Sequence, residues 1–242
     1  MTDQIFDHPR LVAIYDALDP DRSDLEVYAA IAAELGARRV LGVGCGTGTF
    51  ALLLADRGLQ VTGVDPAGGS LGVARAKPGA DRVHWIHADA TMLPPLQVDL
   101  ATMTGNVAQA IVDLPDWEAT LRGVYDALRP GGHFVFETRD PALRAWQEWN
   151  HDASYRTTQV QGVGAVESWV ELTDVSEPLV SFRGTWVFAS AGEVLTSEST
   201  LRFRERANVE TALVAHGFDV VDVRGAPDRP GREFVFVARR RD

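Results

Sequence analysis

Two patterns of hydrophobic and polar positions alternate along residues 37–138. Short apolar runs such as 40–43 are typical of buried strands, and the segments between them carry apolar residues three or four positions apart, which favours helices. Strands that alternate with helices pair in parallel through right-handed crossovers, so we expect an α/β domain here. The expected strands are 40–43, 60–64, 83–87, 98–103 and 134–136, and the expected helices are 50–57, 70–76 and 117–128.

The pattern changes over residues 139–206. Pro141 can open a helix, and three longer segments then alternate between polar and apolar positions with short turns between them. Such alternation is typical of an antiparallel meander with one buried face. The three strand-like segments are 166–175, 179–189 and 194–204. We interpret this stretch as an insertion, a helix plus antiparallel strands, that covers the substrate.

The two ends of the chain complete this division. Residues 1–36 are acidic and hold two helical patterns, so we expect an N-terminal helical cap. Residues 207–242 return to the first pattern, with a helix and two strands at 218–223 and 233–238. We therefore expect one domain formed by 37–138 and 207–242, interrupted by the insertion.

Composition narrows the classes of partner. The 242 residues are 45% hydrophobic, which is enough for a full core, and 34 acidic against 23 basic residues give a net charge of −11. This charge repels nucleic acids and anionic membranes, so we expect neither as a partner. A single cysteine and six histidines without ligand spacing predict no metal site. The start, MTDQIFDHPR, lacks the features of a signal peptide, and we expect a cytoplasmic protein.

The first strand-to-helix turn carries the most informative motif, VLGVGCGTGTF at residues 40–50. Gly44, Gly46 and Gly48 leave the backbone open where a helix begins, and the free N–H groups there suit a nucleotide-like ligand. The spacing is G-x-G-x-G, whereas dinucleotide enzymes use G-x-G-x-x-G, and it is not a P-loop. The turn therefore indicates a nucleoside cofactor other than a nicotinamide or flavin dinucleotide.

Two aspartates follow the next two strands. A carboxylate at Asp65 can accept hydrogen bonds from both hydroxyls of a ribose, and Asp89 can accept one from an exocyclic amine. Each could also cap a turn, and Pro66 follows Asp65 directly. Because both lie at the ends of consecutive strands beside the glycine turn, together they outline one bound nucleoside.

In this order and spacing, the motifs resemble the class I S-adenosylmethionine-dependent methyltransferases of the small-molecule type. The matching stretches are VLGVGCGTG (40–48), VTGVD (61–65), HADATMLP (87–94), VDLATMTGNV (98–107) and LRPGGHFVFET (128–138). The resemblance implies a Rossmann-like fold with a mostly parallel seven-stranded sheet and an antiparallel β insertion after the fifth strand. It also implies S-adenosylmethionine as cofactor and a small-molecule methyl acceptor as partner.

The resemblance further implies roles for single residues around the adenosine. Asp65 would hold the ribose hydroxyls, and Pro66 would sit under the adenine edge. Asp89 would accept the adenine amine, and Ala90 would pack beside the ring. Tyr15, an aromatic residue near the N-terminus, would cover the cofactor.

By the same resemblance, two turns would surround the methionine part and the methyl group. The residues of these turns are Gly44, Cys45, Gly46 and Gly48, then Thr104, Gly105 and Asn106. The sequence departs from the family at Gly42, where an aspartate or glutamate usually helps to anchor the amino-acid end of the cofactor. This departure leaves open a non-catalytic protein that binds S-adenosylmethionine or S-adenosylhomocysteine. A nicotinamide oxidoreductase with an irregular glycine turn is a third alternative.

The expected reaction, methyl transfer from a sulfonium, requires few catalytic groups from the protein. A sulfonium already activates its methyl group, so the chain must mainly align an O, N or C nucleophile in line with it and exclude water. A hydroxyl or protonated amine also needs a general base, for which the candidates are Glu137, Asp140 and His151. The exposed edge of the predicted meander leaves a homodimer open.

Overall fold

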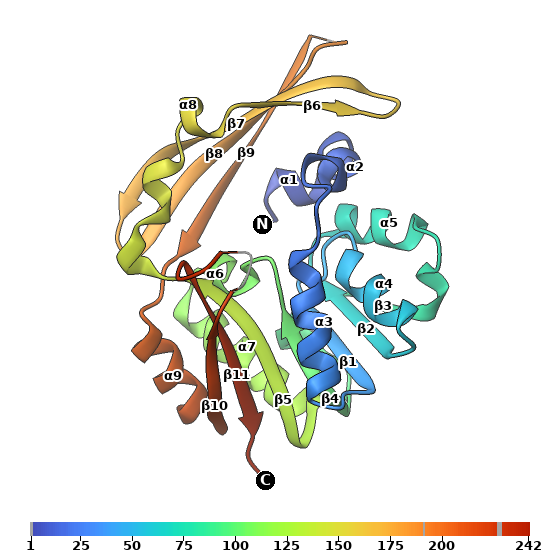
Figure 1. The fold of residues 1–242 in the computed structure, drawn as a ribbon, viewed down its shortest axis with the longest axis vertical. Coiled ribbons are helices and arrows are strands. Elements are labelled where there is room, and N and C mark those ends of the chain that lie inside the picture. The colour runs from blue at the N-terminus through green and yellow to red at the C-terminus, as the bar shows by residue number, and fades with distance from the viewer. Residues whose placement is uncertain (1, 191, 227–228) are drawn as a thin grey trace.

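The computed structural model describes residues 2–190, 192–226 and 229–242, and it has two sheets (Figure 1). The larger is seven-stranded with the order β10-β11-β5-β4-β1-β2-β3. Its strands are β1 (Arg39–Val43), β2 (Gln60–Asp65), β3 (Val83–His87), β4 (Val98–Met103), β5 (Leu128–Arg139), β10 (Phe218–Gly225) and β11 (Glu233–Arg240). β1 to β5 pair in parallel, while β11 is antiparallel to β5 and β10. The predicted fold class is confirmed.

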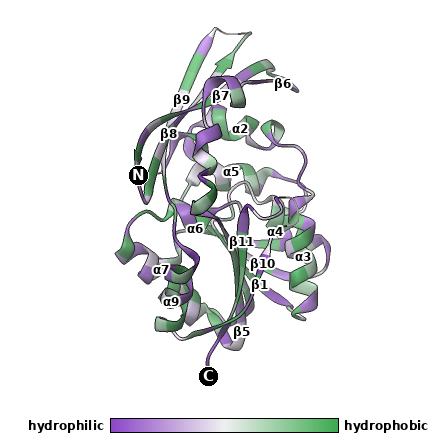
Figure 2. Cartoon of the chain, turned by 60° about the vertical axis from the view of Figure 1, so that its left-hand side comes forward, coloured by the Kyte–Doolittle hydropathy of each residue, from purple (hydrophilic) through white to green (hydrophobic). Residues whose placement is uncertain are grey.

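Helices cover both faces of this sheet because each face carries its own apolar cluster. On one face, side chains of α7 and α9 pack with those of β4 and β5, and on the other face side chains of α3 and α4 pack with those of β1 and β2. In Figure 2, hydrophobic residues are seen along β5 and on α3. The helices are α1 (Gln4–Asp7), α2 (Pro9–Leu18), α3 (Asp24–Glu34), α4 (Thr49–Asp56), α5 (Gly68–Ala76), α6 (Val107–Ala110), α7 (Leu114–Ala127), α8 (His151–Ser154) and α9 (Arg206–Ala215).

The insertion forms a second, four-stranded antiparallel sheet, which we call the lid sheet. Its strands are β6 (Arg156–Val160), β7 (Gly164–Ser176), β8 (Leu179–Phe188) and β9 (Glu193–Arg202), in that order. The predicted meander is present with one strand more than expected. The expected single helix after Pro141 is instead two 3₁₀ helices, η3 (Pro141–Leu143) and η4 (Ala145–Glu148), followed by α8.

The N-terminal helices divide between the two sheets. α1 and α2 pack against the lid sheet in a cluster that includes Leu11, Ile14 and Phe188, whereas α3 packs on the seven-stranded sheet. In Figure 1, α1 and α2 lie between the lid sheet and α5. The first 36 residues therefore join the two layers as well as covering one of them.

β5 is longer than the sequence predicts. The stretch 129–132, which precedes the expected strand 134–136, belongs to β5, and the pairing of β4 with β5 jumps from Leu128 to His133 across it. Gly131 has a φ of +73° at this irregularity. At its other end the strand continues to Arg139 because β11 pairs with residues 133–139, so this part of its length is set by a neighbouring strand rather than by its own apolar run.

Candidate active site

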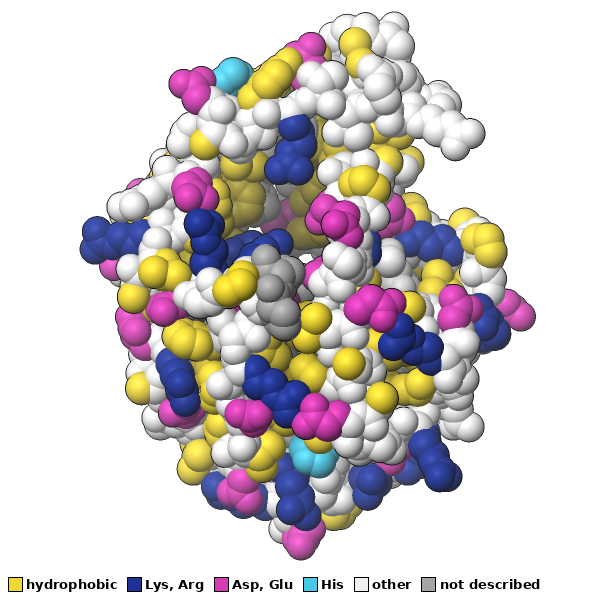
Figure 3. All heavy atoms as spheres, viewed as in Figure 1, with side chains coloured by type: hydrophobic (Ala, Val, Ile, Leu, Met, Phe, Trp, Pro, Cys, Tyr) yellow, Lys and Arg dark blue, Asp and Glu magenta, His cyan; other side chains and the backbone are white. Residues whose placement is uncertain are grey.

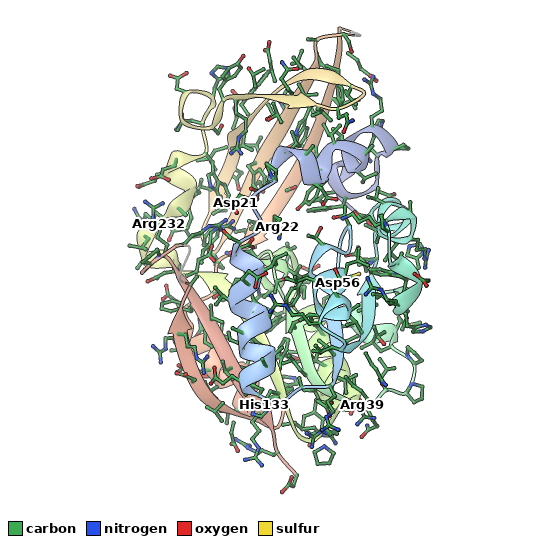
Figure 4. The ribbon with its side chains drawn as sticks, turned by 45° about the vertical axis from the view of Figure 1, so that its right-hand side comes forward. Asp21, Arg22, Arg39, Asp56, His133 and Arg232 are labelled. Carbon is green, nitrogen blue, oxygen red and sulfur yellow. The ribbon has the colours of Figure 1, made fainter. Side chains whose placement is uncertain are left out.

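The carboxyl ends of the parallel strands face the lid sheet. In Figure 4, Asp21 and Arg22 mark the upper end of α3, near that sheet, while Arg39 and His133 lie at the opposite end of the strands. Figure 3 shows the surface hollowed between the two layers, with acidic and basic side chains on its rim. The turns that follow β1, β2 and β4 therefore meet beneath the lid, where open α/β sheets bind ligands.

The glycine turn is closely packed by neighbouring side chains. Gly44 has a φ of +66°, and a Cβ there would lie 2.6 Å from the side chain of Val107. Gly48 is similar, with a φ of +79° and the ring of Trp85 2.5 Å from a built Cβ. The turn thus needs glycine both for its left-handed backbone and for contact with these two residues.

Asp65 links the turn after β1 to the turn after β2. Its side chain is only 7% exposed and accepts hydrogen bonds from the backbone N–H groups of Gly46, at 2.7 Å, and Ala67, at 2.8 Å. Burial raises the pKa of Asp65, and these two hydrogen bonds oppose that shift. Each carboxylate oxygen has a second lone pair, so the group can still accept hydrogen bonds from two hydroxyls. Pro66 is exposed beside it.

Asp89 caps a short helix, the role that the sequence left open as an alternative to binding an exocyclic amine. It is exposed at the start of η2 (Ala90–Met92) and accepts a hydrogen bond from the backbone N–H of Thr91 at 2.8 Å. Ala90 is buried, and its carbonyl lies so near α7 that a Cβ on Gly123 would be 1.8 Å from it. Capping uses part of the acceptor capacity of Asp89, which leaves room for one further donor.

The N-terminal helices contribute two residues to the same place. Burial raises the pKa of the Tyr15 hydroxyl, Arg22 lowers it, and Asp65 is among the carboxylates that raise it further. Tyr15 therefore lies near enough to Asp65 for the two side chains to interact electrostatically. Sequence reasoning missed Asp16, which accepts a hydrogen bond from Thr47 Oγ1 at 2.6 Å.

The Asp16 contacts extend to α5. Lys77, the only lysine of the chain, lies with its Nζ 2.6 Å from Asp16 Oδ2 and 3.0 Å from Thr49 Oγ1. The helical spacing of α2 shows only its apolar face, so nothing in the sequence singles out this carboxylate. We call Asp16, Thr47, Thr49 and Lys77 the α2 latch.

The turn after β4 also has a left-handed backbone. Gly105 has a φ of +76° and Asn106 a φ of +59°. Asn106 is buried and donates its backbone N–H to Glu137 Oε1 at 2.6 Å and its side-chain Nδ2 to Glu233 Oε1 at 3.4 Å. Asn106 Oδ1 is buried and accepts no hydrogen bond from the described residues. Thr104 lies at the start of this turn and lines a small cavity with Gly44.

That cavity lies beside Gly42, where the family usually has an acid. It has a volume of about 20 Å³ and lies between β1, β4 and α4. A Cβ built on Gly42 meets only the Cβ of Cys45, at 3.8 Å. Burial raises the pKa of the Cys45 thiol far above its ordinary value, so this cysteine packs as a small neutral side chain.

The three candidate bases lie in different surroundings. Glu137 is 2% exposed and directly behind the turn after β4, and burial raises its pKa to about 7. Asp140 accepts a hydrogen bond from Ala142 N at 2.9 Å and caps η3. His151 is exposed and packs on the ring of Trp169. Neighbouring residues of a strand point to opposite faces, and Ser168 is buried, so Trp169 and His151 lie on the other face of β7. Of the three, Glu137 alone is next to the turns described above.

The described residues form neither a metal cluster nor a membrane-spanning helix. No group of three or more histidine, cysteine, aspartate or glutamate side chains is arranged to hold a metal. In the same residues, no helix is both long and apolar enough to cross a membrane.

The known proteins that this chain resembles are methyltransferases. A methyltransferase-domain family matches residues 40–132. The malonyl-[acyl-carrier protein] O-methyltransferase of Serratia marcescens is 34% identical over 147 residues, which are 60% of this chain and 53% of that protein. The ubiquinone biosynthesis O-methyltransferase of Idiomarina loihiensis is 34% identical over 114 residues, 45% of each chain. The chain thus spans about half the length of the curated relatives it matches.

Solved structures match the whole fold, lid included. The CcbJ methyltransferase of Streptomyces caelestis superposes with a TM-score of 0.75 and 21% identity, over 96% of each chain. DesVI of Streptomyces venezuelae gives a TM-score of 0.77 at 19% identity, over 93% of this chain and 96% of that one. At these identities the match concerns the fold. Residues 40–132 therefore match a methyltransferase-domain family, and the chain as a whole has the fold of these methyltransferases.

Proposed function

We propose that the chain binds S-adenosylmethionine and transfers its methyl group to a small-molecule acceptor. The observation that carries this proposal is the meeting of three strand-end turns, at 44–48, at Asp65 and at 104–106, beneath the lid sheet. The cofactor supplies a methyl group already activated by the positive sulfur. The protein must then bind, orient and keep water away.

The described residues fit this cofactor. The backbone of the glycine turn would lie along the methionine and ribose, and the carboxylate of Asp65 has lone pairs left for the ribose hydroxyls. Asn106 Oδ1 is a buried acceptor that still lacks a donor among the described residues, next to the expected position of the amino-acid end. Tyr15 would close over the ligand from α2.

We infer that the acceptor enters from the hollow between the two layers. Among the solved structures with this fold are CalS10, an amino pentose methyltransferase of Micromonospora echinaspora, and the sugar N-methyltransferase KedS8 of a Streptoalloteichus species. These relatives support a small molecule as acceptor. The lid residues Trp149 and Phe182, whose ring centroids are 4.8 Å apart, would offer it an aromatic surface.

Calorimetric titration tests the cofactor half of the proposal. We expect micromolar binding of S-adenosylmethionine and S-adenosylhomocysteine and none of NADH. Asp65→Ala should weaken binding on the order of 10²-fold, because two charge-assisted hydrogen bonds contribute ~1.5–3 kcal/mol each. The control Asp219→Ala changes an exposed aspartate on β10 and should bind as the parent does. An unchanged dissociation constant in Asp65→Ala would overturn the placement of the ribose.

Because residue 42 is glycine rather than the acid usual in the family, a second candidate function is a protein that binds the cofactor without catalysing methyl transfer. Screening acceptors for production of S-adenosylhomocysteine separates the two. Turnover on any small acceptor eliminates the binding protein, whereas binding without turnover across hydroxyl and amine acceptors would favour it.

A further inference from the structure

Two buried glutamates from neighbouring strands converge on one residue of the turn after β4. Glu137 lies near the end of β5 and Glu233 at the start of β11, and they are 2% and 5% exposed. Glu137 accepts the backbone N–H of Asn106 at 2.6 Å, and Glu233 accepts its side-chain Nδ2 at 3.4 Å. Burying two carboxylates is unfavourable, so such a pair calls for a compensating interaction.

The residue they hold has an unfavourable backbone conformation. Asn106 and Arg144 are the two non-glycine residues with positive φ among those described, and Arg144 is in the lid. The left-handed region is unfavourable for a residue with a Cβ, although asparagine tolerates it better than most. The two hydrogen bonds from Asn106 offset this strain and keep the turn in one conformation.

The position of Asn106 also fixes its neighbour. Val107 fills the space that a side chain at Gly44 would occupy, with its methyl groups 2.6 Å from the built Cβ. A shift of the turn after β4 would therefore move the packing of the glycine turn. The two glutamates are linked in this way, through Asn106 and Val107, to the first cofactor turn.

We propose that Glu137 and Glu233 are positioning residues that hold Asn106, and through it both turns, in the arrangement that binds S-adenosylmethionine. We call Glu137, Asn106 and Glu233 the glutamate clamp. This inference rests on the proposed function, because it assigns the clamp to the same cofactor site.

The charges around the clamp make it sensitive to pH near neutrality. Glu233 is paired with Arg229 at 2.7 Å and with Arg139 at 3.7 Å. Glu137 also acts on Arg139, because it is among the carboxylates that raise the pKa of that guanidinium against the effect of burial. Burial raises the pKa of Glu137 to about 7, the Tyr28 hydroxyl and the amides of the turn lower it, and Glu233 raises it.

The charge of Glu137 changes the strength of the clamp. An ionised carboxylate accepts an N–H hydrogen bond about twice as strongly as a neutral group does. In the folded state, where Glu137 stays buried, the clamp should therefore hold Asn106 more firmly at pH 8 than at pH 6, even though ionising a buried carboxylate lowers the stability of the fold as a whole. Glutamine at position 137 keeps an acceptor oxygen but cannot ionise, so its clamp should not change over this range.

The test compares Glu137→Gln, Glu137→Ala and the parent at pH 6 and pH 8. Glu198→Gln, which changes an exposed glutamate on β9, is the matched control. The first measurement is amide hydrogen exchange at Asn106 and Val107 without any ligand, with rates corrected for the intrinsic effect of pH. The second is the dissociation constant of S-adenosylhomocysteine.

In the parent and in Glu198→Gln we expect binding to tighten by about 5-fold from pH 6 to pH 8, which corresponds to roughly 1 kcal/mol for one hydrogen bond. Glu137→Gln should show one affinity at both pH values, close to that of the parent at pH 6. Glu137→Ala should lose amide protection at Asn106 and bind at least about 10-fold more weakly at both pH values.

The clamp would be wrong if Glu137→Ala kept the amide protection and the ligand affinity of the parent. It would also be wrong if the affinity of Glu137→Gln changed with pH as that of the parent does. If none of the proteins binds the adenosyl ligand, the proposed function fails, and the exchange rates still decide whether the clamp exists. Glu137→Gln also guards against misfolding of the alanine variant, because it retains the shape and the acceptor.

Discussion

At the scale of single residues, two nearby glycines are required for different reasons. Gly42 lies in β1 and has open space beside it, whereas Gly44 has a left-handed backbone and Val107 in contact. Gly42→Ala should therefore stabilise the fold by ~0.5 kcal/mol, because alanine narrows the unfolded ensemble. Gly44→Ala should destabilise it by ~2 kcal/mol or more through strain and overpacking. Urea unfolding of both variants measures the difference.

Equal effects of the two alanines would contradict this reading of the turn. A further variant, Gly42→Asp, restores the acid that the family usually carries. We expect it to fold and to bind S-adenosylmethionine at least as well as the parent, since a Cβ on Gly42 meets only Cys45, at 3.8 Å, and a cavity of about 20 Å³ lies beside it. A loss of binding, measured by calorimetry, would mean that the pocket is built around glycine.

Glu137 should also make the stability of the fold depend on pH. Its pKa is about 7 in the folded chain against an ordinary value of 4.5, so the folded state binds the proton more tightly. The stabilisation is complete below pH 4.5 and is lost as pH rises through 7, on the order of 3 kcal/mol in all. Glu137→Gln should remove this part of the fall in the free energy of unfolding with rising pH. Urea unfolding at several pH values between 4.5 and 7.5 measures it. The comparison with the parent is needed because the pKa of Asp65 is raised too.

At the scale of elements, the latch on α2 controls one side of the site. Asp16→Ala removes the partner of Lys77 and of the glycine-turn hydroxyl of Thr47. We expect binding of S-adenosylhomocysteine to weaken about 5- to 10-fold, as for loss of one or two hydrogen bonds. Lys77 should react faster with an amine reagent, and mass spectrometry can follow it because the chain has no other lysine. Asp19→Ala, an exposed aspartate just beyond the same helix, should change neither result.

The sequence predicted the elements of the larger sheet better than those of the lid. Buried strands such as β1 and β4 can be predicted from short apolar runs, because both faces of these strands are covered. β6 was missed because its sequence, RTTQV, is mostly exposed and has no alternation. The residues after Pro141 lack the long apolar stripe of an α-helix and form short 3₁₀ helices instead.

Part of the candidate site was likewise predicted from the sequence, and part was missed. The glycine turn and Asp65 stand at strand ends, so the α/β pattern alone brings them together. Glu137 was found as a titratable residue, but its contact with Asn106 could not be foreseen. Glu233 and Asp16 were missed, because their contacts join segments about 127 and 31 residues apart that only the tertiary fold brings together.

At the scale of the whole molecule, α1 is the bridge between the two layers. It is tied to the lid by Ile5 N, which donates to Ser197 Oγ at 3.0 Å, and to α5 by Asp7, which accepts from Gly69 N at 2.8 Å. A Cβ on Gly69 would lie 2.6 Å from the backbone oxygen of Asp7, whereas Gly72 of the same helix has nothing within 4 Å. The spacing between the layers therefore depends on a glycine at position 69.

Gly69→Ala should push α1 away from α5, destabilise the fold by ~1–3 kcal/mol, and raise hydrogen exchange in α1 and β9. Gly72→Ala, the matched control, should be neutral or stabilise the helix by up to ~1 kcal/mol. Identical exchange in β9 for both variants would show that α1 does not couple the layers.

The way the lid enters the chain has an evolutionary consequence. The lid departs after β5 and returns before α9, so the stretch 40–132 that matches the methyltransferase family lies wholly before it. Under the proposed function, a recombination or a run of substitutions within the lid would alter which acceptors are admitted while the cofactor turns keep their sequence. Acceptor choice and cofactor use can therefore diverge at different rates in descendants of this chain.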